Sequence, residues 1–152
     1  MAGAALIIGV GNPLRRDDGV GWVAARAVRR AVPAVRVLEL EGEGASLLEA
    51  WAGAEVAIVI DAVRGGASPG TVYRFEPPGD PLPRTFASTS THAFSLPDAV
   101  ELGRTLTQLP RRLIVYGVEG ADFTAGEGLS AEVEAVVPTV VSRVMAELEA
   151  LR

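Results

Sequence analysis

Three short, almost entirely apolar runs constrain the fold of this sequence more than any other feature: AALIIG at 4–9, VAIVIDA at 56–62 and RLIVYGV at 112–118. Runs of this kind are typical of strands that are buried on both faces of a sheet. Two further strands are predicted where apolar and polar residues alternate, at 35–40 and 70–77. The second follows a Ser-Pro-Gly turn and is predicted to be a half-exposed antiparallel edge strand.

Segments with a helical spacing of apolar residues separate these strands. We predict helices at 18–31, 45–53, 96–107 and 131–151, with Ser95 and Ser130 as the N-caps of the last two. The resulting order, β-α-β-α-β-β-α-β-α, predicts an α/β fold in three layers, with a mostly parallel sheet and helices on both faces. The length of 152 residues, without a repeat or an internal linker, predicts a single domain over 1–152.

The composition excludes several chemistries. The chain contains no cysteine, which excludes disulfides, thiolate metal sites and a cysteine nucleophile. It contains no lysine, which excludes a phosphate-loop lysine and Schiff-base chemistry. His92 is the only histidine, so a zinc site built from two or three imidazoles of this chain is impossible. Any metal site must therefore rely on carboxylates and one imidazole.

Charge and hydropathy also limit the partners. The net charge of −5 argues against nucleic acid, because binding to phosphates requires clustered positive charge. The first residues lack a basic leader, and no apolar run is long enough to cross a bilayer. We therefore expect a soluble, cytoplasmic protein with no membrane partner.

The segment GVGNPLRRDDGVG, residues 9–21, resembles a nucleotide-binding turn between a strand and a helix. The dinucleotide fingerprint requires glycine at position 14, where this chain has Leu14, and two aspartates would repel a pyrophosphate. A carboxylate at a helix N-terminus is favoured by about 0.3–1 kcal/mol. Adjacent residues at a helix start point about 100° apart. We therefore expect Asp17 to cap the helix and Asp18 to face a cleft.

Three titratable side chains are predicted at the carboxyl ends of strands, where ligand sites of open α/β sheets lie. Asp18 follows the first strand, Asp61 ends the strand at 56–62, and His92 closes a long polar loop over 77–91. Two carboxylates and one imidazole suit a divalent transition ion with open coordination positions. Such an ion polarises a carbonyl group and lowers the pKa of bound water.

Simpler interpretations of the same residues stay open at this point. Asp61 fits a turn residue that accepts hydrogen bonds from nearby backbone amides. His92 fits a loop histidine bonded to a carbonyl group. A Ser-His-Asp set is available from Ser88 or Ser90, His92 and Asp98, but the sequence lacks the G-x-S-x-G elbow that would expose a serine nucleophile.

Four motifs in order give the chain a resemblance to a known family. They are GVGNPLRRDDGVG at 9–21, VIDAVRGGASPGTVYRF around Asp61, STHAFSLPDAVEL around His92, and GVEG with GLS between 117 and 130. Together they cover nearly the whole chain, which resembles the nickel–iron hydrogenase maturation endopeptidases. The first metal-contacting position of that family is often glutamate, and proline often stands where this chain has Gly120.

The resemblance implies a fold and an activity. The family has a twisted five-stranded sheet flanked by helices, and it removes a C-terminal extension from the hydrogenase large-subunit precursor after nickel insertion. The nickel arrives on the precursor, bound by its cysteines, so the free enzyme is expected to be metal-empty. The family's metal-contacting positions fall on Asp18, Asp61 and His92, which we expect to be the catalytic residues. The alternatives are a chaperone that checks the precursor for nickel without cutting it, and a generic small-molecule binder.

Overall fold

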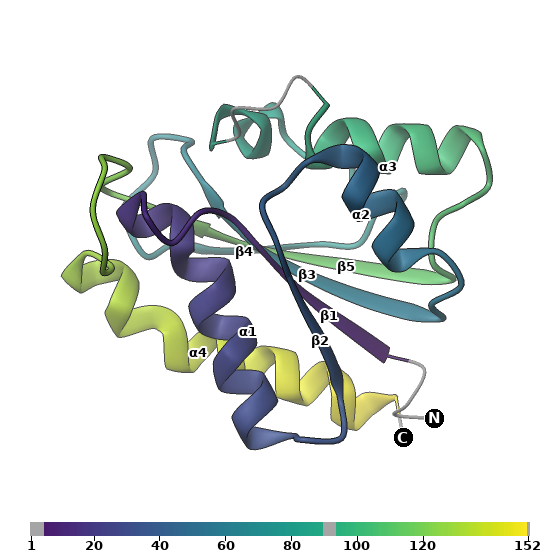
Figure 1. The fold of residues 1–152 in the computed structure, drawn as a ribbon, viewed down its shortest axis with the longest axis horizontal. Coiled ribbons are helices and arrows are strands. Elements are labelled where there is room, and N and C mark those ends of the chain that lie inside the picture. The colour runs from purple at the N-terminus through teal and green to yellow at the C-terminus, as the bar shows by residue number, and fades with distance from the viewer. Residues whose placement is uncertain (1–4, 90–93, 152) are drawn as a thin grey trace.

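The sheet of the computed structural model, which describes residues 5–89 and 94–151, has five strands (Figure 1). They are β1 (Ala5–Val10), β2 (Arg36–Leu40), β3 (Val56–Val63), β4 (Val72–Phe75) and β5 (Arg112–Glu119). Their order across the sheet is β2-β1-β3-β5-β4, and only the β4–β5 pair is antiparallel. The predicted fold class and the antiparallel edge strand are therefore confirmed.

Helices cover both faces of this sheet (Figure 1). One face carries α1 (Val20–Ala31) and α4 (Ala131–Ala150), and the other carries α2 (Gly44–Trp51) and α3 (Leu96–Thr105). Two 3₁₀ turns, η2 (Arg16–Gly19) and η3 (Arg84–Thr89), add to these elements. The start that we predicted for the first helix, residue 18, is wrong, because both aspartates belong to η2 and α1 begins at Val20.

The two core clusters follow the alternation of side chains along the central strands. On β3, Ile58 and Ile60 pack in the cluster under α1 and α4, whereas Val59 and Val63 pack in the cluster under α2 and α3. Asp61 lies between Ile60 and Ala62 on the strand and so shares the face of Val59 and Val63. Asp61 is thus a buried carboxylate on the face covered by α2 and α3.

Two glycines allow the turn after β1 to close over the sheet. A Cβ atom on Gly21 would lie 2.3 Å from the carbonyl oxygen of Ile60, so only glycine lets α1 approach β3 this closely. Gly11 has a φ of +141°, and a Cβ atom there would lie 1.8 Å from the carbonyl oxygen of Asp18. The glycines of the motif thus bring η2 against the end of the sheet.

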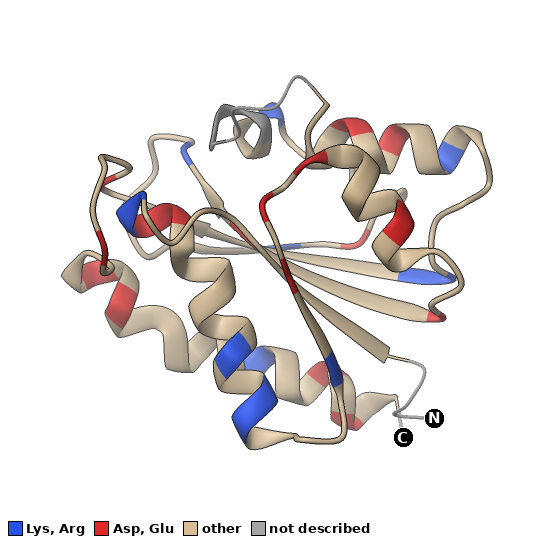
Figure 2. Ribbon diagram, in the orientation of Figure 1, with Lys and Arg blue, Asp and Glu red and all other residues tan. Residues whose placement is uncertain are grey.

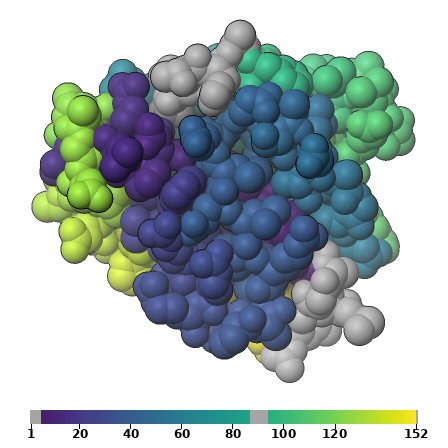
Figure 3. Space-filling view, viewed as in Figure 1, coloured from purple at the N-terminus to yellow at the C-terminus, as the bar shows by residue number. Residues whose placement is uncertain are grey.

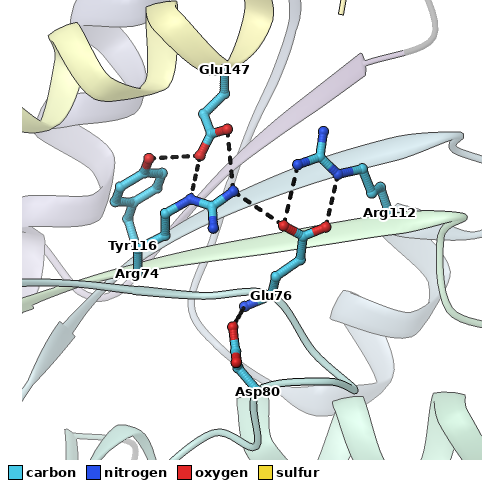
Figure 4. A network of polar contacts seen from close by, with 6 residues as sticks. All are labelled: Arg74, Glu76, Asp80, Arg112, Tyr116 and Glu147. Carbon is cyan, nitrogen blue, oxygen red and sulfur yellow. Dashed lines mark hydrogen bonds and ion pairs between the residues drawn. The ribbon is translucent and has the colours of Figure 1, made fainter. Parts of the chain in front are cut away.

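An ionic network fastens the edge strand β4 to α4 (Figure 4). Arg74 of β4 donates through Nε to Glu147 of α4 at 2.6 Å and through Nη2 to Glu76 at 3.1 Å. Arg112 donates to the same Glu76 at 2.8 Å, and the Tyr116 hydroxyl donates to Glu147 at 2.7 Å. Burial, followed by this hydrogen bond, raises the pKa of Tyr116 to about 12. The network therefore holds the edge strand β4 against α4.

Candidate active site

The carboxyl ends of β1 and β3 form the floor of a small cavity that contains two of the predicted site residues. Asp18 and Asp61 both line it, together with Val10, Gly11, Glu41, Gly42, Phe86 and Leu96. Acidic residues of η2 and of the segment between β2 and α2 lie at this end of the sheet (Figure 2). The structure therefore brings Asp18 and Asp61 together, while His92 lies outside the described residues.

Asp18 reaches the cavity from η2. It is only 6% exposed, and its Oδ2 accepts a hydrogen bond from the backbone N–H of Asn12 at 3.0 Å. Burial raises the pKa of Asp18, although the Asn12 N–H and the charges of Arg15 and Arg64 act in the opposite direction. Asp18 is thus a desolvated carboxylate whose charge is only partly compensated.

Asp61 reaches the cavity from β3 and is 3% exposed. Its Oδ1 accepts a hydrogen bond from the backbone N–H of Ala62 at 2.8 Å. Burial raises the pKa of Asp61 well above its ordinary value, and the negative charge of Asp18 raises it further. Two neighbouring carboxylates in a buried site resist carrying two negative charges, so a proton or a cation between them is favoured.

A cation can take the place of that proton. Metal ions bind deprotonated carboxylates and displace their protons, and each aspartate here offers oxygen ligands to the same cavity. Within residues 5–89 and 94–151, no group of three His, Cys, Asp or Glu side chains is arranged to hold a metal. The described part of the site therefore contains two of the three predicted ligands, Asp18 and Asp61, and the third predicted ligand is His92.

Asp17 has a different role from the one that we predicted. Its carboxylate makes no cap for α1, so that prediction is wrong. Instead it is fully buried and accepts four hydrogen bonds, from the backbone N–H groups of Ala121, Asp122 and Ser130 and from the Ser130 hydroxyl, at 2.7–2.9 Å. Burial alone would raise the pKa of Asp17, but these donors outweigh it and lower the pKa.

Asp17 therefore joins η2 to the loop between β5 and α4. The two segments lie side by side on the surface (Figure 3). Ser130 is the N-cap residue of α4, as predicted, but its hydroxyl donates to Asp17 and makes no bond to the helix. This contact fixes the turn from which Asp18, the next residue, enters the cavity.

The comparison with protein families decides the classification of this chain. The family model described as hydrogenase maturation protease (HycI) matches residues 23–147. The chain belongs to the hydrogenase maturation protease family. The match includes Asp61 and His92 and begins after Asp18.

Individual relatives agree with this classification. The hydrogenase expression/formation protein HupD of Thiocapsa roseopersicina is 32% identical over 123 residues, which cover 78% of this chain and 55% of HupD. This chain thus spans little more than half the length of that relative. The hydrogenase 2 maturation protease of Escherichia coli (strain K12) is 29% identical over 148 residues, which cover 94% of this chain and 89% of that protein.

A solved structure agrees with the classification as well. It is that of the hydrogenase maturating endopeptidase HybD from E. coli, which superposes with a TM-score of 0.78 at 26% identity. The superposition covers 96% of this chain and 92% of HybD. This coverage is larger than that of the family match, which begins after Asp18.

Sequence reasoning missed Glu119, which helps to shape the site of this family member. Glu119, at the end of β5, is 1% exposed and accepts hydrogen bonds from the backbone N–H groups of Gly65 and Gly66 and from the hydroxyl of Tyr73. It thereby holds the loop that carries Arg64 toward Asp18. Its only signal in the sequence is its position at the end of a buried strand.

Two polar residues near the site have structural roles. The side-chain oxygen of Asn12 accepts a hydrogen bond from the backbone N–H of Leu14 at 2.9 Å and so supports the turn after β1. Asp98 accepts hydrogen bonds from the backbone N–H and the hydroxyl of Ser95 at the start of α3, and it pairs with Arg84. Asp98 is therefore occupied in a helix cap, which argues against the Ser-His-Asp alternative.

Proposed function

We propose that this chain is a hydrogenase maturation endopeptidase that removes the C-terminal extension of a nickel-loaded [NiFe] hydrogenase large-subunit precursor. The observation that carries the proposal is the pair of buried aspartates in one cavity, in a chain that belongs to the hydrogenase maturation protease family. The named relatives from E. coli are a maturation protease and a maturating endopeptidase. The nickel is part of the substrate, because the precursor brings it to the site.

In this proposal, Asp18, Asp61 and His92 complete the coordination of the nickel carried by the precursor. Burial disfavours the negative charge of both carboxylates, and the charge of Asp18 adds to this effect at Asp61. A cation that arrives between them compensates these charges. Recognition of the metal thereby orients the peptide with its scissile bond beside the aspartates. A precursor without nickel lacks this contact and is bound less well.

Hydrolysis then needs a base and an acid. A water molecule attacks the scissile carbonyl carbon, and one of the two carboxylates takes the proton that the water loses. The same proton passes to the amine nitrogen as the C–N bond breaks, so the carboxylate is regenerated. Asp18 and Asp61 both line the same cavity, so either one is placed to act as this base.

The test combines the purified protein with nickel-loaded and nickel-free precursor and follows the intact mass of the precursor. We expect loss of the C-terminal peptide from the nickel-loaded form alone. Binding of the loaded precursor without a change in mass would identify a nickel-checking chaperone instead. Absence of both binding and cleavage would leave the small-molecule binder as the better interpretation.

The cytoplasmic location expected from the sequence stays a prediction. Across the helices that the structure describes, none combines the length and the apolar character needed to cross a membrane.

A further inference from the structure

A second cavity lies beside the aspartates, on the same face of the sheet. It measures about 210 Å³, and its lining includes the side chains of Val63, Tyr73, Phe75, Thr85 and Phe86. The share of liquid volume that one water molecule occupies is about 30 Å³, so the cavity has the volume of about seven waters. Its walls are mostly apolar and aromatic, which favours an apolar occupant over water.

Phe86 separates this apolar cavity from the aspartate cavity, because it lines both. It is 1% exposed, and its ring meets that of Phe75 edge-on, with the ring centroids 5.9 Å apart. Gly117 of β5 makes room for Phe86, since a Cβ atom at Gly117 would lie 2.8 Å from the Phe86 ring and 2.7 Å from a methyl group of Val63. One aromatic ring is thus the partition between two adjoining cavities.

The strand register shows how many residues of an extended peptide separate Asp61 from the apolar cavity. Asp61 on β3 and Tyr73 on β4 both pair with Gly117 on β5, so they lie in one row across three strands. Two strand spacings amount to about 10 Å, and an extended chain advances about 3.3 Å per residue. A peptide whose scissile bond lies at Asp61 therefore reaches Tyr73, in the wall of the apolar cavity, after about three residues.

We propose that the apolar cavity receives one aliphatic or aromatic side chain of the precursor, about three residues from the bond that is cut. This proposal rests on the proposed endopeptidase function and adds a determinant of which precursor is accepted. The cavity adjoins the aspartate cavity across the Phe86 ring, so a side chain bound in it fixes the register of the peptide over the site. Nickel binding then distinguishes loaded from unloaded precursor, and the apolar side chain determines which peptide bond is cut.

The kinetic test replaces each apolar residue within four positions of the scissile bond of nickel-loaded precursor by aspartate, one at a time. Burial of one such side chain is worth about tenfold to a hundredfold in kcat/KM, so one replacement, about three residues from the cut, should lower it by that factor. Thr85→Phe fills the cavity and should lower kcat/KM for the unmodified precursor and abolish the sensitivity to that replacement. Thr105→Phe, the same change on the exposed surface of α3, is the control and should leave both unchanged.

A second variant covers the case in which Thr85→Phe does not fold. Phe75→Ala enlarges the cavity and should shift the preference at the sensitive position toward larger side chains, such as tryptophan. Equal kcat/KM for all aspartate replacements would overturn the subsite proposal, and so would an unchanged side-chain preference in both cavity variants. Cleavage by the wild-type protein in the same experiment would still support the endopeptidase function.

A binding measurement separates the two proposals if no cleavage occurs. The probe is a synthetic peptide that spans the C-terminal processing region of the precursor, added to ¹⁵N-labelled protein. Peptide binding in the apolar cavity should change the amide chemical shifts of Val63, Gly65 and Tyr73, and Thr85→Phe or Phe75→Ala should alter these changes. That result would support the apolar subsite even if the endopeptidase function had failed. Shifts elsewhere, or none, would overturn the subsite.

Discussion

Replacement of Asp17 by asparagine tests how η2 is held in place. The Asp17 Oδ2 accepts hydrogen bonds from the N–H groups of Ala121 and Asp122 and from the Ser130 hydroxyl, and Oδ1 accepts one from the Ser130 N–H. Asparagine offers one oxygen and one NH₂ group. With its oxygen in place of Oδ2, the NH₂ group faces the Ser130 N–H, so two donors meet in a fully buried place.

The expected loss follows from these contacts. A hydrogen bond to a charged group contributes about 1.5–3 kcal/mol, and a buried donor left without an acceptor costs about 1–3 kcal/mol. We therefore expect Asp17→Asn to lower the free energy of unfolding by about 2–4 kcal/mol. With a urea slope of about 2 kcal/mol per M, the urea midpoint falls by about 1–2 M.

The pH dependence of this loss has a defined sign. The pKa of Asp17 is lower in the folded protein than its ordinary value of 3.8. A group with a lowered pKa stabilises the fold fully above its ordinary pKa, and the contribution is lost as the pH falls through the folded-state pKa. The difference between wild type and Asp17→Asn should therefore be constant above 3.8 and shrink below it.

The assay is urea unfolding followed by the fluorescence of Trp22 and Trp51. Asp80→Asn is the matched control, because Asp80 is exposed and accepts one hydrogen bond, from the Glu76 N–H. We expect the control to lose only a small fraction of what Asp17→Asn loses. Equal midpoints for the two variants at neutral pH would refute the claim that Asp17 fastens η2 to the loop before α4.

Three further predictions concern the site and the sheet edge. Asp61→Asn should raise the urea midpoint of the metal-free protein at neutral pH, because burial and the Asp18 charge raise the pKa of Asp61. The increase in the urea midpoint should grow as the pH rises above 3.8. A midpoint below that of the wild type would contradict this prediction. Asp18→Asn and Asp61→Asn should each abolish precursor processing in folded protein, by intact mass, whereas folded Asp17→Asn should retain most of it. Equal losses in Asp17→Asn and Asp18→Asn would be contrary to our assignment. Glu147→Gln should lower the pKa of Tyr116 from about 12 toward 10 in an ultraviolet titration and cost about 1 kcal/mol of stability, and an unmoved titration would contradict the network.

The fold could be predicted because its signals are local. Each buried strand is an apolar run, and the helices repeat their apolar residues every three or four positions, so element order and sheet type follow from the sequence alone. Asp18 and Asp61 could be predicted as partners for a related reason. The carboxyl ends of parallel strands meet at one edge of a sheet, which brings residues at those ends together.

The contacts that fix the site could not be predicted, because they join distant positions. Asp17 and Ser130 are 113 residues apart in the chain, and Glu119 and Gly65 are 54 apart. No local pattern distinguishes a carboxylate that caps its own helix from one that accepts donors from a remote loop. The place of Phe86 between two cavities likewise depends on the space that Gly117 leaves on β5.

The most direct test of the shared metal-facing site is a crystal structure of the protein soaked with cadmium, measured for anomalous scattering. We predict one ion bound jointly by carboxylate oxygens of Asp18 and Asp61 and by an imidazole nitrogen of His92, with Asp17 still bonded to Ser130. An ion bound elsewhere, or an ion that contacts Asp17 in place of Asp18, would contradict the assignment of the site.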